Sequence, residues 1–283
     1  MTPVQTAEQA LRDGNVDAAL KSLQDAVRAN PADAKLRVFL FQLLCVLGQW
    51  PRAANQLEVC AELDASTIPM VSTYREALKC ESLREAVFAG KTTPMVFGRP
   101  ALWVAQLVEA LQADARGDTA AAARLRNDAM DAAPATPGSI DGTAFEWIAD
   151  ADSRLGPVLE AVINGRYSWV PFSALVKVTF EEPVDLRDLV WTAAQLEFVN
   201  GGSSVALVPT RYPGTAGDAD GALRLARRTD WLPLTDPHFR GLGQRVFTTD
   251  AADVGLLEAR ELTLRPAPVV DDEAPEGTPD VAA

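Results

Sequence analysis

Histidine is almost absent from this 283-residue chain, which contains only His238. A single histidine excludes a metal site built from several of them, and a Ser-His-Asp triad would also need a GxSxG turn that the sequence lacks. The phosphate-binding patterns GxxxxGK(S/T) and GxGxxG are missing as well, which excludes nucleotide binding by either motif. No apolar run reaches about 18 residues, so we expect no membrane-spanning helix.

Cysteine is also rare, and basic residues are fewer than acidic ones. Cys45, Cys60 and Cys80 form no CxxC pair, and each lies among apolar residues with helical periodicity, so we expect three buried free thiols and a cytoplasmic protein. The first residues show no basic and then apolar pattern, so we expect no export signal. With 26 basic and 39 acidic residues the net charge is −13, which argues against a nucleic-acid-binding surface.

The C-terminal end is the most acidic part of the chain. Residues 266–283 contain five acidic residues and no basic residue, and they are rich in proline and alanine. Such a composition cannot bury enough apolar surface to offset the entropy of folding. We therefore predict a disordered acidic tail over 266–283.

What the sequence does contain is a repeat. GNVDAALKSLQDAVRANPADA begins at Gly14, GQWPRAANQLEVCAELDAS begins 34 residues later at Gly48, and a weaker copy begins at Gly117. A glycine suits the tight turn after a first helix, small alanines allow close crossing of the second helix, and a proline stops it. Residues 1–134 are therefore predicted to form an all-α tetratricopeptide-like array, with two clear repeats over about 1–65 and a degenerate one over about 100–134.

A tetratricopeptide-like array presents a concave surface formed by the first helix of each pair. The apolar and polar positions on that surface either bind a partner or pack against a neighbouring element, and the sequence leaves both possibilities open. In the phase of the repeat the groove positions are Lys35, Val38, Gln42, Cys45, Val104, Leu107 and Leu111.

The residue pattern changes after residue 134. Residues 135–149 are rich in Pro, Gly and Ser and predict a linker, and a helix is expected over about 151–164, ended by Asn164-Gly165. Residues 150–265 then predict a small α+β domain, a partly open barrel or a curled sheet, because short β-like runs alternate with turn residues. The expected strands are Leu175–Phe180, Gln195–Val199, Ser204–Val208, Val246–Thr249 and Leu257–Leu264.

Carboxylates occur in three clusters, DADSR (150–154), EEPVDLRD (181–188) and DADG (218–221). A metal-dependent hydrolase would need several of them to converge, and the pairs best suited to this are Asp150 with Asp152 and Asp218 with Asp220. DADSR lacks the calcium-binding EF-hand pattern, and Arg187 interleaves with the acids of the second cluster. We therefore predict no catalytic centre, no metal site and no cofactor.

Several strings in the second half, in a fixed order, resemble the ImpE/TagJ family, the accessory proteins of bacterial type VI secretion systems. YREALKCESLREAVFAG (74–90) and Trp103 in the first half agree with it, so the resemblance covers about 1–265. The matching strings are DADSRLGPVLEAVINGRYSWVPF (150–172), EEPVDLRDLVW (181–191), LVPTRYPG (207–214), LARRTDW (225–231), GLGQRVFTTD (241–250) and LLEARELTL (256–264).

The resemblance implies a cytoplasmic, non-catalytic adaptor that binds a helix of the contractile sheath subunit TssB and links the sheath to the recycling ATPase ClpV. The motif residues are rich in arginine and aromatics, the types enriched at binding hot spots. Alternatively they build the second domain, with Trp191 and Trp231 buried and the arginines paired with nearby acids. These residues are Arg154, Tyr167, Trp169, Arg187, Trp191, Arg211, Tyr212, Arg228, Trp231 and Arg245.

Two other functions stay open. The array could be a protein-binding module of a different assembly, or the carboxylates could support a metal-dependent hydrolase.

Overall fold

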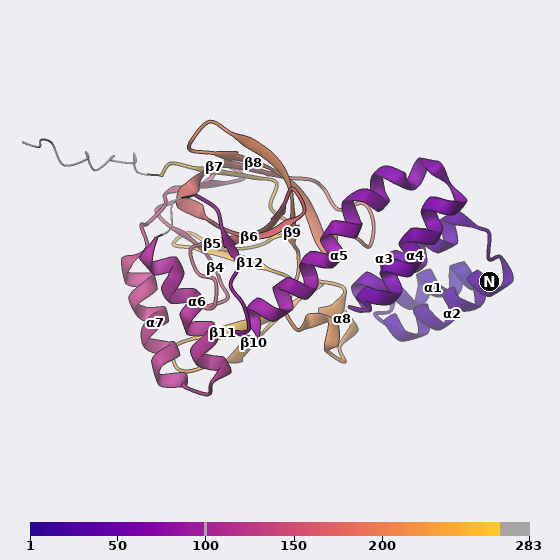
Figure 1. Cartoon of the computed structure of the whole chain (residues 1–283), viewed down its shortest axis with the longest axis horizontal. Coiled ribbons are helices and arrows are strands. Elements are labelled where there is room, and N and C mark those ends of the chain that lie inside the picture. Colours follow the sequence, from indigo (N-terminus) through magenta and orange to yellow (C-terminus); the bar gives the residue numbers. More distant parts are fainter. Residues whose placement is uncertain (99–100, 267–283) are drawn as a thin grey trace, which may run out of the picture.

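The structure is a computed structural model that describes residues 1–98 and 101–266. The predicted disordered tail lies outside the described residues, apart from Pro266. Helices dominate the first half (Figure 1), and within the described ranges no helix is both long and apolar enough to cross a membrane. The helices are α1 (Pro3–Arg12), α2 (Val16–Ala29), α3 (Ala34–Val46), α4 (Trp50–Leu63), α5 (Ile68–Phe88), α6 (Leu102–Ala115), α7 (Thr119–Ala132) and the short α8 (Gly221–Arg224).

The helix pairs α1–α2 and α3–α4 begin and end where the repeat predicts. Asn15 caps α2 and Asp33 caps α3, each by accepting hydrogen bonds from backbone amides of the first turn. Gly14 and Gly48 both have positive φ, 77° and 65°, which a residue with a side chain rarely adopts. At Gly48 a Cβ would also lie 2.7 Å from the Cβ of Ala216. The second turn of the array is therefore in close contact with the second half of the chain.

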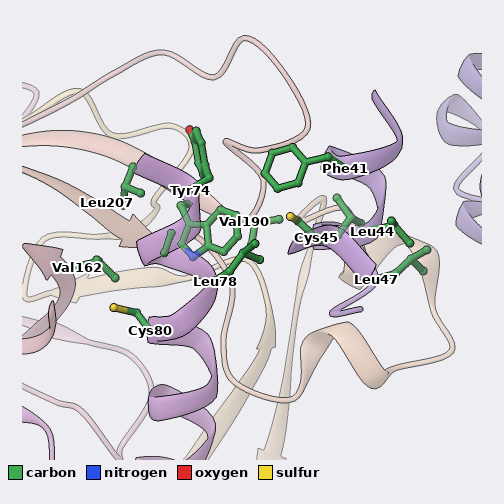
Figure 2. Packing of buried hydrophobic residues seen from close by; sticks show 14 of the residues in the cluster. Phe41, Leu44, Cys45, Leu47, Tyr74, Leu78, Cys80, Val162, Val190 and Leu207 are labelled. Carbon is green, nitrogen blue, oxygen red and sulfur yellow. The ribbon is translucent and has the colours of Figure 1, made fainter. Parts of the chain in front are cut away.

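The C-terminal half of helix α3 is largely apolar, and other elements enclose it. Its residues from Leu40 onward are buried, and a helix that is hydrophobic all round belongs in a core. Figure 2 shows α3 facing Tyr74 and Leu78 of α5, with Val190 of the second half between them. The rings of Phe41 and Tyr74 meet edge to face, with centroids 5.9 Å apart.

The second half is rich in sheet. A nine-stranded sheet has the order β1-β6-β5-β9-β8-β7-β14-β2-β3, and two small sheets have the orders β10-β11 and β13-β12-β4. The larger sheet is open, with β1 and β3 at its edges. The strands are β1 (Met95–Val96), β2 (Gly138–Ile140), β3 (Thr143–Phe145), β4 (Ile148–Asp150), β5 (Val158–Ile163), β6 (Arg166–Pro171), β7 (Leu175–Phe180), β8 (Trp191–Phe198), β9 (Ser203–Pro209), β10 (Thr229–Pro233), β11 (Phe239–Gly243), β12 (Val246–Thr249), β13 (Asp253–Gly255) and β14 (Glu261–Leu264).

The predicted order, a tetratricopeptide-like helical region followed by a sheet-rich region, is confirmed. Beside a small cluster of alanines between α6 and α7, two large hydrophobic cores hold it together. One core joins α1–α5 to the sheet face that carries Val162, Tyr167 and Leu207, and the other fills the opposite face, with Phe172 and Phe247 in edge-to-face contact. The helical and sheet regions therefore share a core.

Helices α6 and α7 do not extend the array, which corrects the prediction of one helical unit over 1–134. Figure 1 shows α1–α4 on one side of α5 and the α6–α7 pair on the other, beside the sheet region. Met130 of α7 lies against Gly156, where a Cβ would be 2.1 Å from its terminal methyl carbon. The degenerate repeat thus forms a helical hairpin that contacts the turn before β5.

The predicted helix over 151–164 is wrong. Residues 151–157 form turns, and 158–163 form β5. Both faces of β5 are buried, and a doubly buried strand carries a continuous apolar run that periodicity cannot distinguish from a helix. Asn164 and Gly165, both with positive φ, make the two-residue turn of the β5–β6 hairpin rather than a helix end.

The predicted linker over 135–149 is also wrong, because β2, β3 and most of β4 lie within it and pair in the sheets. Two expected strands, Leu175–Phe180 and Val246–Thr249, occur with the predicted bounds as β7 and β12. The last one is shorter than expected, since only Glu261–Leu264 of the run 257–264 is extended.

Trp191 is completely buried, as predicted, whereas the prediction for Trp231 is wrong because that side chain is 40% exposed. We expect Trp191→Ala to lower the free energy of unfolding by about 3–5 kcal/mol. The Trp231 ring is tilted by 56° against the ring of Tyr212, with centroids 5.7 Å apart, and because this side chain is only partly buried, Trp231→Ala should cost less than Trp191→Ala. Urea denaturation of both variants measures this, and equal losses would contradict the assignment.

Candidate functional site

A buried ion network joins α5 to the sheet. Glu160 lies on the β5 face that also carries Val158 and Val162 and that faces α5. Arg84 donates from Nε to Glu160 Oε1 at 2.8 Å and from Nη2 to Oε2 at 3.1 Å. Arg245 contacts both Glu160 and Asp150. A charge enclosed in this way is tolerated only when it is paired and hydrogen-bonded.

Aromatic hydroxyl and indole groups complete this network. Tyr167 donates to Glu160 Oε1 at 2.6 Å, and Trp169 Nε1 donates to the Tyr167 hydroxyl at 2.8 Å. Tyr212 donates to Asp150 Oδ1 at 3.0 Å. Burial raises the pKa of Asp150 above its ordinary range, although the positive charge of Arg245 acts to lower this pKa.

Asp152 belongs to a neighbouring pair. Its carboxylate accepts from Arg154 Nε at 2.9 Å and from the amide of Gly241 at 3.0 Å. The Arg154 guanidinium in turn lies 4.8 Å above the ring of Phe88 at the end of α5. Asp152 therefore connects β11 to α5 through Arg154.

Arginines of the second half also hold the ends of the array helices. Arg211 donates to the carbonyls of Val46, at 2.8 Å, and Cys45, at 3.4 Å, which end α3. Arg227 donates to the carbonyls of Leu11 and Arg12, at 2.8 and 2.9 Å, which end α1. Because the last carbonyls of a helix have no partner within it and carry partial negative charge, a guanidinium stabilises them.

The structure brings most of the motif residues together in this buried region, including Trp191, whose Nε1 donates to Glu81 Oε1 at 2.8 Å. Arg187 is half-buried over the ring of Tyr74, and Arg228 and Trp231 lie at the surface. The converging residues are Arg154, Tyr167, Trp169, Trp191, Arg211, Tyr212 and Arg245.

Glu81, Arg84 and Glu160 were not among the sequence candidates. The signal that could have found Glu160 is a lone charge inside the apolar run GPVLEAVING, where a buried acid demands a partner. Nothing in the sequence pairs it with Arg84, which lies 76 residues away.

The predicted groove does not form as one surface. Gln42 and Cys45 are buried, and Val104, Leu107 and Leu111 of α6 are buried in a different part of the molecule. Elements of the second half cover the C-terminal part of α3, so the packing alternative applies there. Only Lys35, which is exposed, and Val38, which is half-buried, stay accessible.

The paired carboxylates have structural contacts instead of converging. Asp218 accepts from the amide of Asp220, and Asp220 caps α8 and pairs with Arg228. Across the described ranges, 1–98 and 101–266, there is no group of three or more His, Cys, Asp or Glu side chains placed to hold a metal ion.

A cleft of about 330 Å³ lies beside the ion network. It is bounded by the start of α4, by α5 and by the loop after β9, which contribute Trp50, Arg84 and Arg211 respectively. Two of the converging motif residues, Arg211 and Tyr212, therefore line this cleft.

Comparison with known proteins finds similarity over most of the chain. The model of a family described as ImpE protein matches residues 142–263, and a model of the tetratricopeptide repeat matches residues 10–71. The chain is 54% identical over 260 residues to the type VI secretion system accessory component TagJ of Pseudomonas aeruginosa, covering 92% of this chain and 91% of that protein.

A solved structure, that of protein VPA1032 from Vibrio parahaemolyticus, has the same fold. It superposes with a TM-score of 0.84 at 24% identity, covering 92% of this chain and 97% of that one.

Replacing Glu160 by glutamine removes the charge that Arg84 and Arg245 share, and we expect it to lower the free energy of unfolding by about 3–5 kcal/mol near neutral pH. Burial would raise the pKa of Glu160, but Arg84 and Arg245 outweigh it and hold the pKa at about 2. Because this value lies below the unfolded pKa, the carboxylate stabilises the fold fully above about pH 4.5, and its contribution is lost as the pH falls toward about 2.

The stability difference between the wild type and Glu160→Gln should therefore shrink between about pH 4.5 and about pH 2, measured by urea denaturation at a series of pH values. A difference that stays constant over this range would contradict the charged state of Glu160.

Proposed function

This chain belongs to the ImpE/TagJ family, and we propose that it acts as a non-catalytic adaptor of a type VI secretion system in the cytoplasm. The observation that carries the proposal is the 54% identity to the accessory component TagJ over 92% of the chain. The tetratricopeptide-like helical region supports it, because such arrays bind segments of other proteins.

The finer proposal is that the protein binds a helix of the sheath subunit TssB and links the sheath to the ATPase ClpV. A partner helix would lay an apolar stripe on the part of the array that stays accessible. That part includes the N-terminal half of α3, where Lys35 is exposed and Val38 is half-buried. The C-terminal half is already covered, so the contact would be shorter than a full concave groove.

The contacts of the acidic residues support a role without catalysis. Asp150 and Asp152 are each paired with an arginine, and Asp220 caps a helix. A general base or metal ligand needs a carboxylate with free lone pairs directed at a substrate or ion. A hydrolase built on these acids therefore has less support than an adaptor.

A charge placed in the proposed contact should prevent it. We expect Val38→Glu to weaken binding of TssB by about a hundredfold, because the new carboxylate would be desolvated against an apolar stripe. Lys35→Glu, at an exposed position, should also weaken binding, without a change in folding. Lys21→Glu is the matched control, since Lys21 is exposed on α2, the second helix of the first pair.

Isothermal titration with purified TssB and, separately, with ClpV measures these affinities, and circular dichroism checks folding. Unchanged TssB affinity in both α3 variants would rule out this surface. Absence of binding to either protein by the wild type would count against the adaptor proposal itself.

A further inference from the structure

The 330 Å³ cleft at the junction of the array, α5 and the loop after β9 has a ligand-sized volume, at the lower end of the range of small-molecule sites, about 300–1,000 Å³. Its apolar wall includes Leu47, Trp50 and Pro213, and its polar wall includes Arg84 and Arg211. The cleft is separate from the proposed contact at Lys35 and Val38, so an inference about it does not depend on that contact.

Arg211 is the unusual member of this wall. Its side chain is only 4% exposed, and the described residues offer it backbone carbonyls alone, those of Cys45, Val46 and Arg224. The buried arginines Arg84, Arg154 and Arg245 each contact a carboxylate. Arg211 therefore differs from them in lacking a counter-ion among residues 1–98 and 101–266.

The surroundings of Arg211 disfavour its positive charge. Burial lowers its pKa to about 10, and the neighbouring cations Arg84 and Arg224 act in the same direction, opposed chiefly by Glu81. Its Nε–H group donates to no acceptor in the described part of the chain, and neither does the amide of Gly214, which lines the same cleft. A negatively charged group in the cleft would offset the desolvation of the guanidinium.

The two glutamates of the cleft do not supply that group. Glu81 accepts from the indole of Trp191 and lies 3.5 Å from Arg84. Glu85 accepts from the indole of Trp50 at 2.8 Å. Both carboxylates are thus engaged by donors other than Arg211.

We propose that this cleft binds a carboxylate, with Arg211 as its counter-charge and Trp50, Leu47 and Pro213 in contact with its carbon chain. The volume suits a small organic acid or the acidic side chain of a peptide. Because the walls come from the array, from α5 and from the sheet region, the bound carboxylate joins all three and stabilises the folded chain.

Gly217 allows a test that leaves Arg211 in place. It lines the cleft, its backbone is outside the left-handed region, and a Cβ added there meets no atom within 4 Å. Gly217→Asp adds a negative charge to the wall of the cleft. Gly217→Asn is the control, because its side chain has nearly the same shape and no charge. The probes are succinate, which represents a small acid, and the peptide acetyl-Asp-Asp-Glu-amide, which represents an acidic protein segment.

We expect the wild-type chain to bind at least one probe with a Kd of about 1 mM or tighter by isothermal titration, and to melt at a higher temperature when saturated. Gly217→Asn should keep that affinity within about threefold, and Gly217→Asp should lose about tenfold or more by repulsion. Succinate binding would indicate a small acid as the source, and binding of the peptide alone would indicate a protein segment. Binding of neither probe, or equal affinities in the two variants, would overturn the proposal.

Discussion

Two hydrogen bonds between the guanidinium of Arg84 on α5 and the carboxylate of Glu160 on β5 join the helical and sheet regions. Both groups are charged and buried, so leaving either one unpaired would cost much free energy. Apolar burial alone is non-directional and would allow α5 to slide along the sheet. A bidentate guanidinium–carboxylate pair fixes both position and orientation. Arg245 and Tyr167 satisfy the remaining lone pairs of Glu160, so the network determines how α5 lies on the strands.

The position of α5 determines how the second half contacts the array. With α5 fixed, loops of the second half reach the C-terminal ends of α1 and α3, where Arg227 and Arg211 donate to the last carbonyls. Gln42 and Cys45 are buried in the C-terminal part of α3, which packs into the shared core, and this removes part of the concave face from any partner. A surface held this rigidly loses little conformational entropy on binding, which favours affinity from a small contact.

Much of this fold could be predicted from the sequence, because the signals are local. The 34-residue spacing of Gly14 and Gly48 predicted the paired helices, and short β-like runs between turn residues predicted β7 and β12. The failures came from tertiary context: β5 is buried on both faces, so its apolar run looked helical, and the supposed linker is stabilised by strand pairing. The motif residues were found, but their common partner Glu160 and its link to Arg84 depend on a contact between distant segments, which one sequence does not reveal.

The central claim is that a shared core and the Arg84–Glu160 network make the helical and sheet regions a single cooperative unit. Equilibrium unfolding in urea, followed both by far-ultraviolet circular dichroism and by tryptophan fluorescence, tests it directly. The helical signal comes mostly from the array and α5, and four of the six tryptophans, Trp147, Trp169, Trp191 and Trp231, belong to the sheet region. We predict coincident two-state transitions for both signals, and two separate transitions would contradict the claim.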